Sequence, residues 1–222
     1  MRIDILSLFP EMFAPLKTSL IKRATDAQKL EINILDIRDF SKDKHKKCDD
    51  YPYGGGAGLV MTPQPIADAF MSIEGYGQAH KIFMTPTGKT FNQSKVVELS
   101  KMDHIIILCG HYEGVDQRII DLFIDEEISI GDFVLTGGEI PAMAVVDAVA
   151  RYVDGVLGSE ESLKEESFSS SLLEYDQYTR PQVFMGKEVP FVLVNGDHGK
   201  IDKWRKENSL KKTKERRPDL LK

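Results

Sequence analysis

The sequence predicts an α/β fold in which a mainly parallel sheet is flanked by helices. Short apolar runs that are typical of buried strands alternate along the chain with segments of helical period. The chain has 222 residues, of which 41% are apolar and 29% charged. A chain of this length and composition can bury a large core without disulfides or structural metals.

The individual elements follow from these patterns in chain order. Strands are expected at Ile3–Leu8, Ile32–Ile37, Lys81–Met84 and His104–Cys109. Helices are expected at Thr18–Gln28, Pro63–Ser72, Asn92–Lys101 and from Asp116 through Phe123. Asn92 and Asp116 are suited to the N-cap positions of their helices because their side chains accept hydrogen bonds from exposed backbone N–H groups.

The stretch SIGDFVLTGGEIPA, Ser129–Ala142, predicts a short buried strand that ends in two glycines. A helix should follow, with Pro141 in its first turn. One face of that helix would carry Ala142, Val145, Val146, Val149 and Val153, with Arg151 on the opposite side. Arg151 either pairs with Asp147 or directs its guanidinium at an anion, and the spacing leaves both interpretations open.

The amino-acid composition of the chain changes at Gly158. We expect residues 1–158 to form one domain and the acidic, serine-rich residues 159–176 to form a flexible linker. Residues 177–222 would form a small, mostly helical, basic domain, in which Asp197 caps a helix through about Lys206.

Charge is distributed unevenly about a net value of −6. Residues 160–175 hold five acidic side chains against one basic one, whereas residues 200–217 hold nine basic against three acidic. A basic tail on an acidic body either binds a polyanion or is simply a solvated helix face.

Several classes of protein lack support. Met1 leads directly into the strand-like RIDILSLF, so no signal peptide is expected, and no apolar run approaches the roughly 20 residues of a membrane span. A cytoplasmic location is therefore predicted. Cys48, Cys109 and the histidines match no metal or redox spacing, and no Gly-x-Ser-x-Gly motif supports serine hydrolase chemistry.

Four glycine-bearing loops occupy residues 49–60, 85–89, 109–116 and 129–139. GGGAGL is not a dinucleotide fingerprint, because Leu59 stands where the last glycine belongs, and it is not a phosphate-binding loop of the Gly-Lys-Ser/Thr type. Each loop alone is typical of a turn. Together they predict a pocket built from backbone at the carboxyl ends of strands, suited to a neutral, hydrogen-bonding group such as adenine.

A specific resemblance rests on motifs that occur in order over almost the whole chain. They are LFPEMF, DDYPYGGGAG, CGHYEGVDQR, EISIGDFVLTGGEIPAM, DGVLGSE, ESFSSSLLEYDQYTRP and RRPDLL. In these motifs the chain resembles the bacterial tRNA (guanine-N1)-methyltransferases of the SPOUT class. The resemblance implies a C-terminal trefoil knot in the first domain, which is an exception to the general avoidance of knots.

In that family the knotted loops hold S-adenosylmethionine, and here they correspond to residues 83–88, 109–114 and 130–141. The cofactor-binding residues that the resemblance implies are Phe83, Met84, Thr85, Pro86, Gly110, Tyr112, Glu113, Ile130, Gly131, Phe133, Leu135, Gly137, Gly138 and Pro141. Phe133 stands where the family usually has tyrosine, so a contact through that hydroxyl is lost.

The implied reaction is methyl transfer to N1 of the guanosine 3′ to the anticodon in tRNA. It needs a general base at N1 and positive charge near O6. Arg151 matches the family's catalytic arginine. Glu166 stands where the family has the aspartate that acts as base, and Glu165 is the alternative.

The resemblance also implies how RNA is held. Asp49, Tyr53 and Gly58, with the loop Gly54–Gly58, would hold the flipped guanine. The cations that would grip tRNA phosphates are Lys203, Arg205, Lys206, Arg216 and Arg217.

Further expectations come from the same family. Its members are homodimers that share each active site between chains. Magnesium is associated with them, and Glu113, Glu166 and Glu174 match its candidate ligands. A further helical stretch follows RRPDLL in the family, which predicts weaker RNA affinity for a chain that stops at Lys222. Two rival functions stay open: a different SPOUT RNA methyltransferase, and a non-catalytic RNA-binding module with a vestigial cofactor pocket.

Overall fold

The computed structural model describes residues 1–157, 166–168 and 171–221. The chain divides into two compact units, Met1–Gly158 and Ser159–Lys222. Each unit is described by itself.

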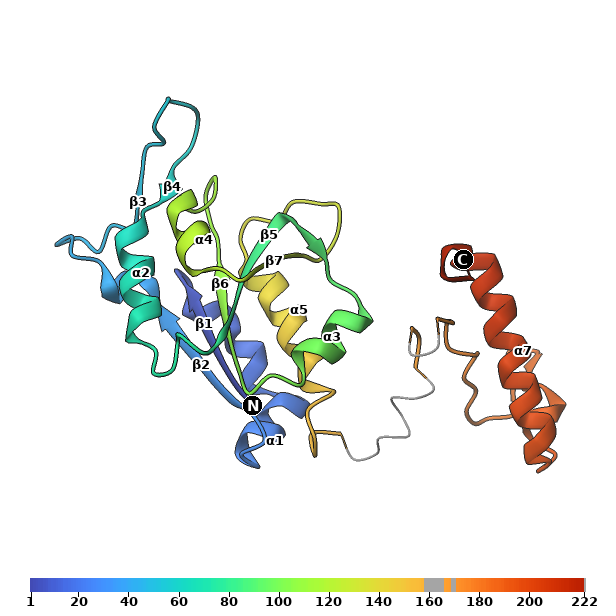
Figure 1. Cartoon of the computed structure of the whole chain (residues 1–222). Coiled ribbons are helices and arrows are strands. Elements are labelled where there is room, and N and C mark those ends of the chain that lie inside the picture. Colours follow the sequence, from blue (N-terminus) through green and yellow to red (C-terminus); the bar gives the residue numbers. More distant parts are fainter. Residues whose placement is uncertain (158–165, 169–170, 222) are drawn as a thin grey trace. The chain divides into compact units, whose positions relative to one another are not determined.

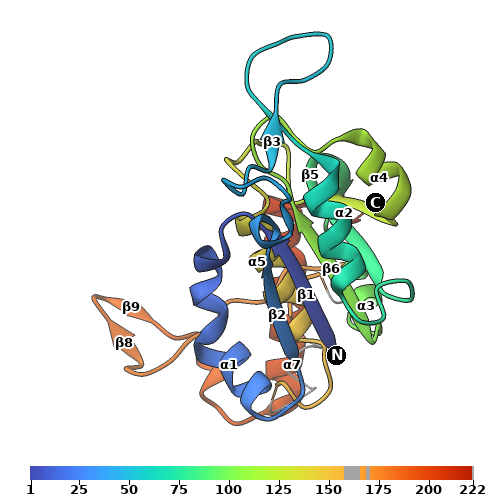
Figure 2. The same cartoon turned by 90° about the vertical axis from the view of Figure 1, so that its left-hand side faces the viewer.

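The first unit is built on a five-stranded sheet in the order β2-β1-β6-β5-β7 (Figures 1 and 2). Its strands are β1 (Arg2–Ser7), β2 (Glu31–Asp36), β5 (His80–Thr90), β6 (His104–Cys109) and β7 (Glu126–Ser129). All four neighbouring pairs are parallel. The prediction of a mainly parallel sheet is therefore confirmed, and the carboxyl ends of all five strands meet at one edge.

Helices cover both faces of this sheet, as the near-continuous apolar strands require. The α-helices of this unit are α1 (Ser19–Asp26), α2 (Pro63–Ser72), α3 (Gln93–Leu99), α4 (Gln117–Phe123) and α5 (Glu139–Ala150). Alternate residues of β6 point to opposite faces: Ile105 and Ile107 pack with α1, α3 and α5, whereas Ile106 and Leu108 pack with α2 and α4. Figure 1 shows α2 on one side of the sheet and α3 and α5 on the other. The 3₁₀ helices η1 (Pro10–Lys17) and η2 (Ile37–Phe40) and the short strands β3 (Asp49–Asp50) and β4 (Val60–Met61) complete the unit.

Capping residues behave as the sequence predicts. The Asn92 side chain accepts a hydrogen bond from the Lys95 backbone N–H at 3.1 Å. The Asp116 side chain accepts one from the Arg118 backbone N–H at 3.0 Å. Both helix starts are thus confirmed, and the helix predicted at Pro63–Ser72 has those bounds.

Three local predictions are wrong. β5 continues to Thr90, so the loop expected at 85–89 lies within a strand whose pairing shifts between Met84 and Lys89. The buried strand expected in the stretch 129–142 ends at Ser129, and Phe133 and Val134 are 54% and 80% exposed. Val153 lies beyond the end of α5, although it still packs against the predicted core.

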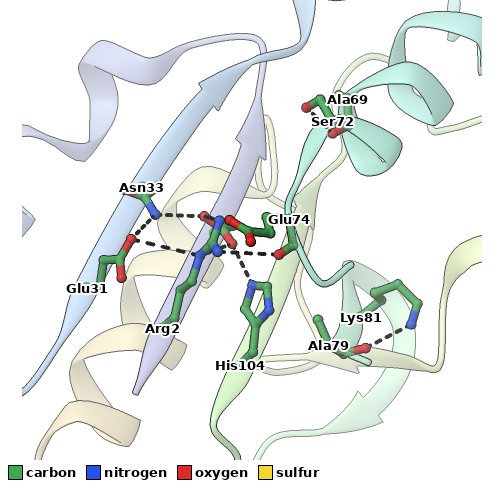
Figure 3. Close-up of polar contacts among 10 residues, drawn as sticks. Arg2, Glu31, Asn33, Ala69, Ser72, Glu74, Ala79, Lys81 and His104 are labelled. Carbon is green, nitrogen blue, oxygen red and sulfur yellow. Dashed lines mark hydrogen bonds and ion pairs between the residues drawn. The ribbon is translucent and has the colours of Figure 1, made fainter. Parts of the chain in front are cut away.

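The buried carboxylate of Asp4 organises the amino-terminal edge of the sheet, and its partners Arg2, Asn33 and His104 are labelled in Figure 3. Asp4 is fully buried, and its Oδ2 lies 2.6 Å from His104 Nε2 and 2.9 Å from Arg2 Nε. Asn33 Nδ2 donates to Asp4 Oδ1 at 2.9 Å. Since a buried charge must be paired, this network stabilises the start of β1, β2 and β6 at the edge opposite the glycine loops.

The second unit centres on the helix α7 (His198–Arg216), with the hairpin β8 (Val183–Phe184) and β9 (Lys187–Glu188) and two 3₁₀ helices, η3 (Phe191–Leu193) and η4 (Pro218–Leu221). Asp197 caps α7 as predicted, accepting from the Lys200 backbone N–H at 3.2 Å. The helix runs to Arg216, well beyond the expected end near Lys206. No helix in the described parts of the chain is both long enough and apolar enough to cross a membrane.

Described residues of the segment predicted as a flexible linker form hydrogen bonds with α7. The Leu173 backbone N–H donates to Thr213 Oγ1 at 2.9 Å, and the Asp176 backbone N–H donates to Asn208 Oδ1 at 2.8 Å. Polar side chains of the helix thus pair with the backbone of these residues, and the flexible linker stays a prediction. Glu165 lies outside the described residues.

Candidate functional site

A hollow of about 260 Å³ opens at the carboxyl edge of β5, β6 and β7. This volume is close to the lower end of the roughly 300–1,000 Å³ typical of small-molecule sites. The hollow is lined by all fourteen residues that the sequence assigns to cofactor binding: Phe83, Met84, Thr85, Pro86, Gly110, Tyr112, Glu113, Ile130, Gly131, Phe133, Leu135, Gly137, Gly138 and Pro141. Strand β5 and two loops, at residues 110–114 and 128–141, thus form one cavity although they are far apart in the chain.

Close backbone packing holds these loops together. The Gly138 backbone N–H donates to the Gly110 carbonyl at 2.8 Å. A Cβ atom on Gly138 would lie 2.8 Å from Cys109 Cα and 3.0 Å from the Gly110 nitrogen. Side-chain atoms can move aside but backbone atoms inside a sheet cannot, so only glycine fits at position 138.

Part of the lining was not predicted from the sequence. The additional residues are His111, Gly114, Ile128, Ser129, Val134 and Thr136. Most of these residues directly adjoin a predicted cofactor-binding residue in the sequence. The motifs that contain the predicted residues could therefore have indicated these neighbours as well. His111 also packs its ring 4.7 Å from the Phe9 ring, which comes from the carboxyl end of β1.

Glu139 is a second feature that the sequence did not single out. It is 1% exposed at the first turn of α5, and its Oε1 accepts a hydrogen bond from Ser7 Oγ at 2.8 Å. This bond ties β1 to the start of α5 beneath the glycine loops. Burial, together with the charge of Glu139, raises the pKa of the Cys109 thiol well above its ordinary value. Cys109 is therefore a packing residue and not a thiolate nucleophile.

The loop predicted to hold the target base is joined to the rim of the hollow. The Glu113 backbone N–H donates to the Leu59 carbonyl at 2.9 Å, and the Met61 N–H donates to the Gly114 carbonyl at 2.9 Å. A Cβ on Gly58 would lie 2.4 Å from Glu113 Oε1, so Gly58 lies against a residue of the hollow. Asp49 begins this loop in β3, and Tyr53 is fully exposed where the loop projects from the unit (Figures 1 and 2).

Arg151 is not brought to the hollow of its own chain. It is the C-cap of α5, whereas Gly138 caps the other end of that 12-residue helix. At a rise of 1.5 Å per residue, the two ends are roughly 18 Å apart.

The remaining predicted residues lie in the second unit. Glu166 precedes the turn at Ser167, Glu174 follows Leu173 on the segment that packs on α7, and Lys203, Arg205 and Arg216 lie on α7. Lys203, Lys206, Arg216 and Arg217 are exposed. Arg205 is partly buried, with its guanidinium 4.8 Å from the centre of the Tyr175 ring, so packing accounts for part of its placement.

The described residues do not fit the magnesium site that the family implies. Among them, no three His, Cys, Asp or Glu side chains gather as a metal ion would require. Glu113 belongs to the first unit and Glu166 and Glu174 to the second.

Comparison with known proteins gives a consistent result. The family model described as "tRNA (Guanine-1)-methyltransferase TrmD" matches residues 1–222. A tRNA (guanine-N(1)-)-methyltransferase of Caldanaerobacter subterraneus is 56% identical over 223 residues, covering 100% of this chain and 92% of the relative. The proteins of the same name from Clostridioides difficile and Clostridium botulinum are 54% and 55% identical over 100% of this chain and over 98% and 92% of their own lengths. The full-length match, over a chain whose glycine loops close around one hollow, shows that this protein belongs to the tRNA (guanine-1)-methyltransferase family.

Proposed function

We propose that this protein transfers a methyl group from S-adenosylmethionine to N1 of the guanosine 3′ to the anticodon of tRNA, in the cytoplasm. The observation that supports this best is the convergence of strand β5 and two separated glycine-bearing loops on one ligand-sized hollow. The names of the relatives give the same reaction class.

The hollow suits the nucleoside part of the methyl donor. Its walls combine apolar side chains, such as Phe83 and Leu135, with glycine backbone that brings N–H and C=O groups close to a ligand. Gly110, Gly131, Gly137 and Gly138 let the surrounding backbone and side chains pack closely around the hollow, and backbone groups of Ile130, Phe133 and Leu135 would hydrogen-bond the adenine and ribose. When bound, S-adenosylmethionine supplies an electrophilic methyl group on a sulfonium.

The two side chains assigned to the reaction have complementary tasks. Guanine N1 carries a proton at neutral pH, so Glu166 takes that proton as general base. Negative charge then develops at O6, where the Arg151 guanidinium stabilises it. The N1 lone pair forms the new bond to the methyl carbon as the carbon–sulfur bond breaks.

We propose that the active site is completed by a second copy of the chain in a homodimer. Arg151 lies at the far end of α5 from the hollow of its own chain, so a single first unit cannot bring them together without a partner. Ile140 on α5 is 48% exposed, and the helix is apolar on nearly all sides, as expected of a helix that packs on two surfaces. The trefoil knot is part of the same proposal, since knotted loops would hold the hollow in shape.

The reaction is tested by methyl transfer to tRNA transcripts that differ only in the nucleotide 3′ to the anticodon. Transcripts with guanosine at that position should be methylated at N1, and transcripts with adenosine should not. Equal methylation of both would favour a different SPOUT methyltransferase. Calorimetry addresses the non-catalytic alternative, because a pure RNA-binding module would show no heat of binding with S-adenosylmethionine.

We expect the exposed cations of α7 to grip tRNA phosphates. Replacing Lys203, Lys206 and Arg216 together with alanine should weaken tRNA binding and lower the slope of log K against log salt by roughly 0.7–0.9 per cation removed. Binding should be measured between about 50 and 200 mM salt. Lys22→Ala on α1 is the matched control, because Lys22 is an exposed helical cation of the first unit. An unchanged slope in the triple variant would show that this face of α7 is solvated surface.

A further inference from the structure

The segment that carries Glu166 is held by α7 through a chain of hydrogen bonds. Leu173 N–H donates to Thr213 Oγ1 at 2.9 Å, and Thr213 Oγ1 donates to the Ser209 carbonyl at 2.7 Å. Thr213 is fully buried, so its hydroxyl cannot exchange these partners for water. The Thr213 hydroxyl thus accepts a hydrogen bond from the segment and donates one to the backbone of α7.

A second anchor lies one helical turn earlier. The Asp176 backbone N–H donates to Asn208 Oδ1 at 2.8 Å, and Asn208 Nδ2 donates back to Asp176 Oδ2 at 3.1 Å. Lys212 Nζ lies 2.5 Å from Asp176 Oδ1. The hydrogen bonds from Lys212 and Asn208 lower the pKa of Asp176, so the carboxylate, and with it the anchor, persists to lower pH than for an ordinary aspartate.

The anchored residues are connected back to Glu166. The Glu174 backbone N–H donates to Ser167 Oγ at 3.0 Å, and Ser167 follows Glu166 directly in the chain. The Phe168 backbone N–H also donates to the Leu172 carbonyl at 2.8 Å. The path from α7 to Glu166 therefore runs through Thr213, Leu173, Glu174 and Ser167 without a gap.

We infer that α7 is the scaffold that positions the catalytic carboxylate, with Thr213 as its central positioning residue. This inference rests on the proposed role of Glu166 as the base. The buried face of α7 would thus position the carboxylate, in addition to the phosphate binding proposed for its exposed cations. A general base must lie within about 2.6–3.2 Å of the proton it takes, so a small displacement of the segment has a large cost in rate.

The test is Thr213→Val, which keeps the shape of the side chain and removes its hydroxyl. We expect kcat at saturating tRNA to fall roughly ten-fold or more, because Leu173 N–H loses its acceptor and the segment shifts. KM for tRNA and the affinity for S-adenosylmethionine should stay unchanged. Thr213→Ser, which retains the hydroxyl, should restore kcat.

Thr25→Val is the matched control. Thr25 Oγ1 donates to the Ile21 carbonyl at 3.0 Å, the same bond to the residue four positions earlier that Thr213 makes, but no segment accepts from or donates to its hydroxyl among the described contacts. Its kcat should equal that of the wild-type protein. If Thr213→Val does not fold, Ser167→Ala breaks the same path at its half-buried end and should show the same loss of kcat.

A double-mutant cycle separates this inference from the proposed function. In a Glu166→Gln background, Thr213→Val should cause no further loss, because the carboxylate that it positions is already gone. An equal loss in both backgrounds, or no loss in either, would overturn the inference. Unchanged turnover of Glu166→Gln alone would instead overturn the assignment of the base.

Discussion

Replacing Glu166 with glutamine is expected to lower kcat for methyl transfer by about 10²–10⁴-fold, the usual contribution of general acid–base catalysis. Glutamine has nearly the same shape as glutamate but cannot accept the N1 proton. The affinity for S-adenosylmethionine, measured by calorimetry, should not change, because the hollow lies in the other unit of the chain. Methyl transfer should be measured in single turnover, so that product release does not mask the chemical step.

Glu215→Gln provides the control for this experiment. It makes the same chemical change at an exposed position of α7, and Glu215 has no assigned role. Its turnover should match that of the unmodified protein. Undiminished turnover of Glu166→Gln would exclude Glu166 as the base and direct attention to Glu165.

Replacing Gly138 with alanine is expected to produce the largest loss of cofactor binding. The added methyl group would lie 2.8 Å from Cys109 Cα and 3.0 Å from the Gly110 nitrogen, both of which are backbone atoms. Overpacking of this kind costs about 1–3 kcal/mol, which corresponds to a roughly 5- to 150-fold loss of affinity if the loops move apart to relieve it. Calorimetric titration with S-adenosylmethionine measures the loss directly.

Thermal unfolding of Gly138→Ala shows whether the substitution affects only the hollow or lowers the stability of the whole unit. Gly77→Ala is the matched control, because a Cβ at that position would meet no atom within 4 Å. Gly110→Ala should give a milder loss, since its methyl group would meet the edge of the Phe83 ring at 2.9 Å and a ring can turn aside. Wild-type affinity in Gly138→Ala would show that the ligand does not use the junction of these loops.

Much of the first unit could be predicted from local patterns. Apolar runs correctly predicted four strands, because strands that are buried on both faces consist almost entirely of hydrophobic residues. Asn92 and Asp116 marked helix starts in this unit, as Asp197 did in the second unit, because their side chains cap exposed N–H groups.

The errors arose where tertiary contacts overrode local pattern. The residues 85–89 were expected to form a loop because of their proline and glycine, but pairing with β7 resumes at Lys89 and extends the strand. Phe133 and Val134 were expected to be buried because they are apolar, yet both are exposed where they line the hollow. An apolar residue in a strand and one in a ligand site look alike in a sequence.

The segment before α7 shows a further limit. Its serines and acidic residues predicted flexibility, and nothing local indicated that Thr213 and Asn208 would hold it. These bonds join residues that are 40 and 32 positions apart, so no pattern within a short window can reveal them. The chemical nature of the site was accessible from motifs, whereas the position of Arg151 relative to the hollow required the fold.

Mixing two inactive variants tests the account most directly. Gly138→Ala disables the hollow and keeps Arg151, whereas Arg151→Ala removes the guanidinium and keeps the hollow. If the hollow of one chain works with Arg151 of its partner, mixed dimers contain one intact site. Co-refolding equal amounts should then restore roughly a quarter of wild-type turnover. No recovery in a sample shown by differential tags to contain mixed dimers would contradict a site shared between chains.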